Sequence, residues 1–141
     1  MTSEFSIAAH ALVYLYHKDT TLSSEQLAEN ICTNPARVRK VMAQLKRAGL
    51  VATKEGIDGG YLLRGDAAAV TLRTVADAVG AKFVASSWRS GDADMECLVA
   101  SGMADIMDGL FARLDALCRE ELERTSILDL NNLIFKKEGS L

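Results

Sequence analysis

Residues 31–54 carry six Lys/Arg and no Asp or Glu. Guanidinium and ammonium groups bind phosphate oxygens, so a stretch of this kind is the electrostatic footprint expected of a nucleic-acid-binding surface. A basic run is also typical of an ordinary solvated helix face, and charge alone does not separate the two interpretations. The elements that carry and flank the run must therefore decide between them.

A helix is predicted to carry most of these cations. Asn34 is suited to an N-cap, and Pro35 follows at the first helical position, where its missing N–H costs no hydrogen bond. Gly49 is placed to end the helix. Apolar residues recur between these points at i, i+3, i+4 and i+7, namely Val38, Val41, Met42 and Leu45. One face of this helix packs, and the other positions are largely basic.

A second predicted helix precedes the basic one. Ser23 and Gln26 have the spacing of a capping box, which places the start of this helix at Ser23. It can extend only to about Ile31 before the start signal at Asn34, so a turn of about three residues joins the two helices. This arrangement is the helix-turn-helix, in which the second helix lies in the major groove of DNA.

A glycine-rich hairpin is predicted to follow. Apolar residues 50–52 and 61–63 flank a tip at residues 56–60 that contains three glycines. Two helices followed by a hairpin form a winged helix-turn-helix. The glycines also raise the alternative of a phosphate cradle for a nucleotide, but the sequence lacks GxxxxGK[ST] and no helix begins after them. We therefore favour the wing.

Residues 3–64 resemble the N-terminal domain of the Rrf-type family of bacterial winged-helix transcription regulators, and look most like its YwnA-like branch. The motifs that carry the resemblance are residues 33–35, 38–42, 45–51, 56 with 59–63, and 70–72 with 75–79. Family members are dimers that bind a pseudo-palindromic operator. The resemblance implies a mainly α fold with a small β-hairpin wing, and a transcriptional repressor rather than an enzyme.

The resemblance also places individual residues at the DNA. Asn34, Ala36 and Arg39 match positions that meet base edges, and arginine can donate two hydrogen bonds to guanine, which contributes about 1–3 kcal/mol of discrimination. One wing position departs from the family: an arginine that often reaches the minor groove is replaced by Glu55, so either Lys54 takes its role or the wing stays outside the groove. The expected DNA-binding set is Asn34, Ala36, Arg37, Arg39, Lys40, Gln44, Arg47, Lys54, Gly59, Gly60 and Tyr61.

A long helix over residues 98–125 is predicted to join two chains. Its apolar stripe is too wide for one small domain to cover. Residues that flank the centre of the stripe and widen it are Ile106, Phe111, Cys118 and Leu122. A core helix in a compact monomer is the alternative, but we favour a homodimer whose two-fold axis presents two winged helices to two half-sites. The stripe alternates by four and three residues, as in coiled coils, at Met103, Met107, Leu110, Leu114 and Leu117.

The 141 residues and 49% hydrophobic content suffice for one DNA-binding domain and an oligomerisation segment. We predict a DNA-binding domain at 1–80, a connector at 81–97, and a dimerisation helix with a C-terminal segment at 98–141 that packs against it. The N-terminal helix is apolar nearly all round, so it needs cover, in part from a partner chain. Residues 1–65 hold 8 Lys/Arg against 6 Asp/Glu, whereas residues 66–141 hold 8 against 13.

The remaining functional alternatives are narrower. We expect a cytoplasmic protein, since the chain has neither an 18-residue apolar run nor a secretory leader pattern. No Ser-His-Asp, Cys-His or metal-ligand constellation indicates an enzyme. A winged-helix adaptor that binds an acidic protein surface is the alternative to a DNA-binding regulator, and the effector is unknown.

Three cysteines are present, and no CxxC pair. By the family resemblance Cys97 matches the last of three cysteines that hold an iron-sulfur cluster in some relatives. The other ligands are missing, so we expect no cofactor and no metal. Cys32 lies two residues before Asn34, near the positive end of the basic helix, and is a candidate redox-sensing thiol. The alternative is a small buried side chain in the turn.

Overall fold

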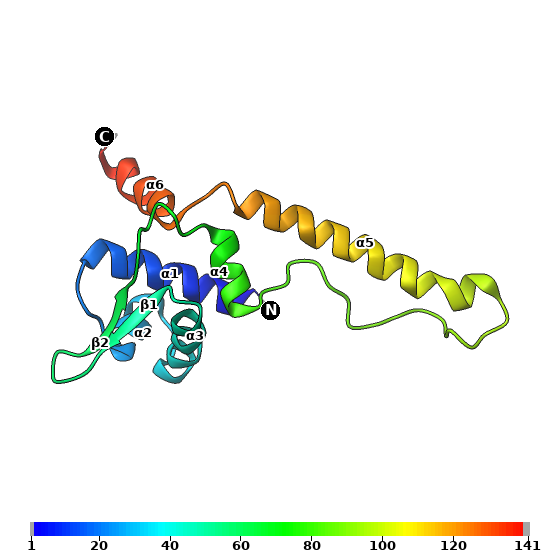
Figure 1. The fold of residues 1–141 in the computed structure, drawn as a ribbon, viewed down its shortest axis with the longest axis horizontal. Helices are drawn as coiled ribbons and strands as arrows, with labels where there is room; N and C mark the ends of the chain where they lie inside the picture. Colours follow the sequence, from blue (N-terminus) through cyan, green and yellow to red (C-terminus); the bar gives the residue numbers. More distant parts are fainter. Residues whose placement is uncertain (1, 140–141) are drawn as a thin grey trace.

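The structure is a computed structural model that describes residues 2–139, and this part of the chain is mainly helical with one β-hairpin, as predicted (Figure 1). The elements in chain order are α1 (Ser3–Lys18), α2 (Ser24–Ile31), α3 (Pro35–Arg47), β1 (Val51–Lys54), β2 (Gly60–Leu63), α4 (Leu72–Val79), α5 (Leu98–Leu122) and α6 (Ile127–Gly139). We refer to α1–α4 with the hairpin as the winged-helix unit.

Helices α2 and α3 begin where their capping residues predict. The Ser23 hydroxyl accepts a hydrogen bond from the Gln26 backbone N–H at 3.1 Å, and the Gln26 side chain accepts one from the Ser23 N–H at 2.8 Å. The Asn34 side chain caps α3 by accepting the Arg37 N–H at 2.8 Å. These bonds satisfy N–H groups that lack a partner within the helix, so both start points are fixed locally.

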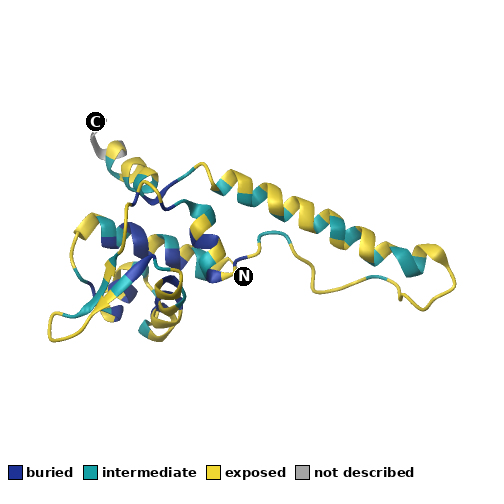
Figure 2. Cartoon of the chain, viewed as in Figure 1, coloured by how far each residue is buried: buried dark blue, intermediate teal, exposed yellow. Residues whose placement is uncertain are grey.

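The hydrophobic core lies within the winged-helix unit, where Figure 2 shows most of the buried segments. Helices α1, α2, α3 and α4 pack around it, and the predicted apolar face of α3 is fully buried. The largest fully buried side chains are Leu12, Leu15, Leu27, Val38, Val41, Met42, Leu45, Val51, Val75 and Ile127. Packing on this side of α3 leaves its opposite side free for a partner.

The hairpin is antiparallel, with Val51 opposite Leu63 and Lys54 opposite Gly60. Its second strand also pairs with the segment before α2: the Leu22 N–H donates to the Tyr61 carbonyl at 2.9 Å, and the Tyr61 N–H donates to the Leu22 carbonyl at 2.7 Å. Gly60 has a φ of 149°, and a Cβ there would lie 2.3 Å from the Leu22 oxygen. Only glycine allows this approach, so Gly60 fixes how the wing docks.

The position of α6 corrects one expectation. The C-terminal segment packs against α1 and not against the long helix α5, which extends away from the winged-helix unit (Figure 1). The physical reason is that α1 is apolar nearly all round, so its outer face needs cover. Ile127 at the start of α6 is fully buried in the core, and the ring of Phe135 stacks on His17 with centroids 4.1 Å apart. None of the helices in the described range has the length and apolar character needed to span a bilayer.

Candidate nucleic-acid interface

The outer side of α3 is exposed and basic. Ala36, Arg37, Arg39, Lys40 and Arg47 are exposed, as is the N-cap residue Asn34. Gln44 differs from these residues because it is half-buried. Its side-chain oxygen is fully buried and has no hydrogen-bond partner in the described part of the chain. An amide that faces inward is poorly placed to contact a base.

Neighbouring helices hold three of the α3 cations. Arg37 donates to the Ser3 hydroxyl at 2.6 Å, and the Lys40 ammonium lies 3.0 Å from the Glu4 carboxylate, so both contact the start of α1. On the other side Arg39 lies 3.7 Å from the Glu25 carboxylate of α2.

The pKa of Glu25 is lowered, first by its own backbone N–H and then by the Ser24 hydroxyl, with Arg39 adding a smaller effect. Glu25 therefore remains charged at neutral pH. The Arg39 side chain is 52% exposed, so a phosphate group can approach it beside this carboxylate or replace the carboxylate.

The wing supplies fewer outward groups than the sequence suggests. Lys54 is exposed at the end of β1, next to the equally exposed Glu55. Gly59 and Gly60 shape the backbone, since a Cβ on Gly59 would lie 2.4 Å from the Lys54 oxygen. Tyr61 is half-buried against the core. Gly59, Gly60 and Tyr61 thus have structural roles, and those of Gly60 and Tyr61 depend on Leu22, which is distant in the sequence.

Helix α5 has no buried residue along its 25 positions, and Figure 2 shows it exposed or half-buried throughout. The predicted stripe is open to solvent: Met103 is 40% exposed, Leu110 37%, Leu114 39% and Leu117 59%, and Met107 is half-buried. Of the flanking residues, Phe111, Cys118 and Leu122 are half-buried, whereas Ile106 is 66% exposed. The stripe is therefore partly covered on the side where Phe111 lies beside the connector, and uncovered elsewhere.

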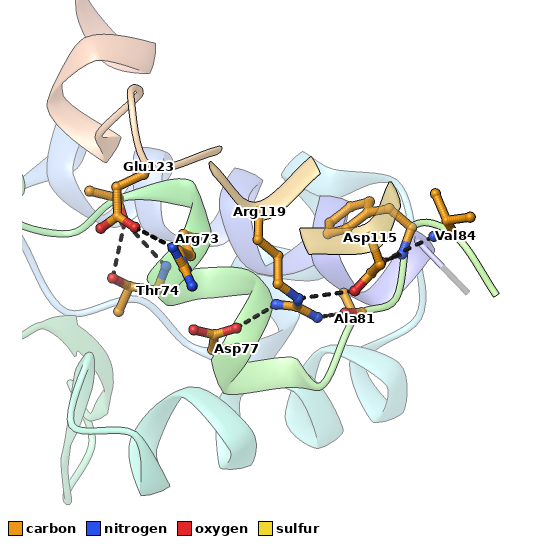
Figure 3. A network of polar contacts seen from close by, with 10 residues as sticks. Arg73, Thr74, Asp77, Ala81, Val84, Asp115, Arg119 and Glu123 are labelled. Atoms are coloured by element: carbon orange, nitrogen blue, oxygen red, sulfur yellow. Dashed lines mark hydrogen bonds and ion pairs between the residues drawn. The ribbon is translucent and has the colours of Figure 1, made fainter. Parts of the chain in front are cut away.

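An arginine that the sequence analysis missed joins α5 to the winged-helix unit (Figure 3). Arg119 donates to Asp115 at 3.2 Å, pairs with Asp77 of α4, and donates to the Ala81 carbonyl. The only local signal is the i, i+4 spacing of Asp115 and Arg119 in an apolar helix.

The Asp115 carboxylate in turn fixes the connector. It accepts hydrogen bonds from the backbone N–H groups of Phe83 at 2.8 Å and Val84 at 3.1 Å. These two N–H groups, followed by Arg119, lower the pKa of Asp115. Through this carboxylate and Arg119, the start of the connector is held to both α4 and α5.

The cysteines lie on separate elements. Cys32 is exposed at the end of α2, with a φ of 65° and its sulfur 3.7 Å from the Glu29 carbonyl oxygen, so the buried alternative is wrong. Cys97 is exposed before α5, where the backbone N–H groups of Ala100 and Val99 lower the pKa of its thiol. Within the described range no three His, Cys, Asp or Glu side chains gather in a way that could hold a metal ion.

Known proteins match this chain over nearly its whole length. YwnA of Bacillus subtilis (strain 168), which is named as an HTH-type transcriptional regulator, is 27% identical to this chain over 135 residues. These residues cover 96% of this chain and 99% of YwnA. A crystal structure of a protein from Lactobacillus plantarum, described as a transcriptional regulator, matches this chain with a TM-score of 0.78 at 23% identity. The match covers 99% of both chains. CymR of B. subtilis, the global cysteine regulator, has a TM-score of 0.69 at 18% identity, with 94% of this chain and 96% of CymR covered. The two structures share the fold of this chain.

The Rrf2 family model, described as an iron-dependent transcriptional regulator, matches residues 1–132. The described residues do not fit the iron of that description, because the three cysteines are dispersed over α2, the start of α5 and its far end. The match itself spans the winged-helix unit, α5 and the start of α6, and the chain belongs to the Rrf2 family of transcriptional regulators.

Proposed function

We propose that this regulator is a homodimeric repressor that binds a pseudo-palindromic operator in the cytoplasm, with residues 1–80 as the DNA-binding domain. The observation that carries the dimer is the uncovered apolar stripe on α5. A row of exposed Leu and Met on one helix face is costly in water and is covered when a second copy packs against it.

The length of α5 suits this arrangement. A helix of 25 residues is about 38 Å long, and Leu110 lies at its midpoint. Two antiparallel copies that cross near Leu110 hold their winged-helix units at opposite ends. The length of α5 is close to the spacing of about 34–36 Å between half-sites one turn of DNA apart.

In this proposal the exposed side of α3 enters the major groove. Asn34, Ala36 and Arg39 read base edges, and Arg37 and Lys40 lie beside them. Lys46, Arg47 and Lys54 bind the phosphate backbone. We assign Gly59, Gly60 and Tyr61 to the shape of the wing, and Gln44 to the inner side of α3, because of the contacts and burial described above.

The operator is found by incubating the purified protein with genomic fragments and sequencing those retained. A shared inverted repeat supports the proposal. Binding to that repeat must weaken steeply with salt, since cations on the protein release counterions from DNA. Retention without a shared sequence, or affinity that is insensitive to salt, favours the adaptor alternative.

The dimer is tested with Leu110→Glu, which places a charge at the centre of the stripe. The matched control is Ala116→Glu, an exposed position on another face of α5. We expect Leu110→Glu to give folded monomers with most operator affinity lost, because one winged-helix unit forfeits the second half-site, and the control to remain dimeric. Wild-type monomers that still protect a two-fold operator in footprinting would contradict the proposal.

A further inference from the structure

A pocket of about 480 Å³ lies between α1 and α6. In Figure 1 the C-terminal ends of these two helices lie on the opposite side of the winged-helix unit from the direction in which α5 extends. A second copy that pairs through α5 therefore leaves this pocket open. Its volume is within the range of about 300–1,000 Å³ typical of small-molecule sites.

The wall of the pocket is apolar and aromatic. Leu133 and Ile134 on α6 are 65% and 52% exposed and line the opening. The rings of His17 and Phe135 are stacked with an angle of 14° between their planes, and Tyr14 adds a third ring. Rings that present their faces or edges favour another flat ring over a flexible chain.

The polar groups gather at one part of the lining. His10 and Asn30 lie 2.7 Å apart, and because an amide oxygen only accepts hydrogen bonds, Nε2 of His10 is the donor. This leaves the amide NH₂ of Asn30 as a donor for another group. No acidic residue is among the described residues that line the pocket. The free Asn30 donor, in a lining without a carboxylate, suits an anionic oxygen.

We propose that this pocket binds a small, flat aromatic carboxylic acid, which acts as an effector of DNA binding. The ring lies among the apolar and aromatic side chains, and the carboxylate accepts a hydrogen bond from the Asn30 amide NH₂. The binding site stands on the pocket alone. Its effect on DNA rests on the proposed function.

The position of Asn30 explains how occupancy reaches the DNA-binding surface. Asn30 is in the last turn of α2, four residues before the Asn34 cap of α3. Its bond to His10 is the one side-chain hydrogen bond between α1 and α2 among the described residues. A carboxylate that accepts a hydrogen bond from the Asn30 NH₂ adds a second contact to this residue and shifts the end of α2, and with it the turn that positions α3.

The test uses naphthoate as the probe, with the full-length protein and isothermal titration calorimetry. Leu133→Glu puts a like charge at the opening, and Leu133 is exposed, so the fold should tolerate it. Asn132→Glu adds the same charge at an exposed α6 position outside the lining and is the matched control. Asn30→Ala removes the amide donor. Naphthamide and naphthylmethylamine test the contribution of the negative charge.

We expect Leu133→Glu and Asn30→Ala each to weaken naphthoate binding about tenfold or more, and Asn132→Glu to leave it within about twofold. The amide should bind more weakly than the acid, and the amine most weakly. No saturable binding of naphthoate by the wild type up to about 1 mM overturns the proposal. So does equal binding by Leu133→Glu, or an amine that binds as tightly as the acid.

The effector role is measured by fluorescence anisotropy with the operator recovered from genomic fragments. Naphthoate should change operator affinity of the wild type and of Asn132→Glu, but not of Leu133→Glu. Naphthoate binding with unchanged operator affinity overturns the effector role. A protein that binds naphthoate but retains no specific DNA either with or without it contradicts the proposed function and leaves the binding site supported.

Discussion

Replacing Arg119 with methionine should loosen the attachment of α5 to the winged-helix unit. The change removes the ion pair with Asp115, the ion pair with Asp77 and the hydrogen bond to the Ala81 carbonyl. The Arg119 side chain is only 19% exposed and that of Asp115 17%, whereas Asp77 is 59% exposed and regains water. Exposed pairs contribute about 0–1 kcal/mol and breaking buried pairs costs about 3–5, so we expect a loss of about 2–3 kcal/mol.

The matched control is Arg73→Met. Arg73 pairs with Glu123 at 2.9 Å and so also joins α4 to α5, but its side chain is 42% exposed and that of Glu123 54%. This variant should lose less than about 1 kcal/mol. The assay is denaturant and thermal unfolding at one fixed protein concentration, where each kcal/mol corresponds to about 2–4 °C in Tm for a chain of this size. Equally small losses for the two variants would show that burial does not strengthen the ion pairs of Arg119.

The same network predicts an acid dependence. The folded pKa of Asp115 is lowered by the N–H groups of Phe83 and Val84 and then by Arg119, so the charged form is favoured in the folded state. This contribution to stability is fully present above the unfolded pKa of about 3.9 and is lost as pH falls through the folded pKa. The difference between wild type and Arg119→Met should therefore shrink below about pH 4. A constant difference across this range would show that Asp115 does not contribute.

Three further outcomes follow from the site. Arg39→Ala should weaken operator binding by about 1–3 kcal/mol and relax preference at one base pair per half-site, whereas Lys46→Ala should weaken operator and random DNA alike; equal losses for Arg39→Ala on both DNAs would contradict base reading. Glu55→Arg should strengthen binding in mobility-shift assays, most on sites with a narrow minor groove, and an unchanged affinity would mean that the wing tip stays away from DNA. Cys97 should react with iodoacetamide at neutral pH faster than Cys32, as measured by peptide mass spectrometry, because backbone N–H groups lower the Cys97 pKa. Faster modification of Cys32 would contradict this.

Features set by a few adjacent residues were predictable from the sequence. The caps at Ser23 and Asn34 involve residues within three positions of each other, and they placed α2 and α3. The apolar spacing of α3 likewise identified the face that is buried. Local signals of this kind suffice to orient the basic surface outward, because burying one side of a helix determines which side remains exposed.

Features that join distant residues were not predictable in this way. Arg119 meets Asp77 and Ala81 across 42 and 38 positions, and no spacing rule links residues so far apart. Gly60 was assigned to DNA because glycines are typical of a wing, but its conformation follows from the approach of Leu22. Helix α6 was expected on α5, although the uncovered face of α1 offered a competing surface nearer the core.

The acidic residues near α3 bear on selectivity. Lys40 and Arg39 already have partners in Glu4 and Glu25, and these exposed pairs are weak enough for DNA to replace. The displaced carboxylates stay near the phosphates and reduce the attraction that acts on any sequence. In the proposed complex, base contacts from Arg39 add affinity only at the correct site. Since nonspecific sites greatly outnumber operators, we expect these base contacts, and not the phosphate contacts, to set the fraction of protein bound at its operator.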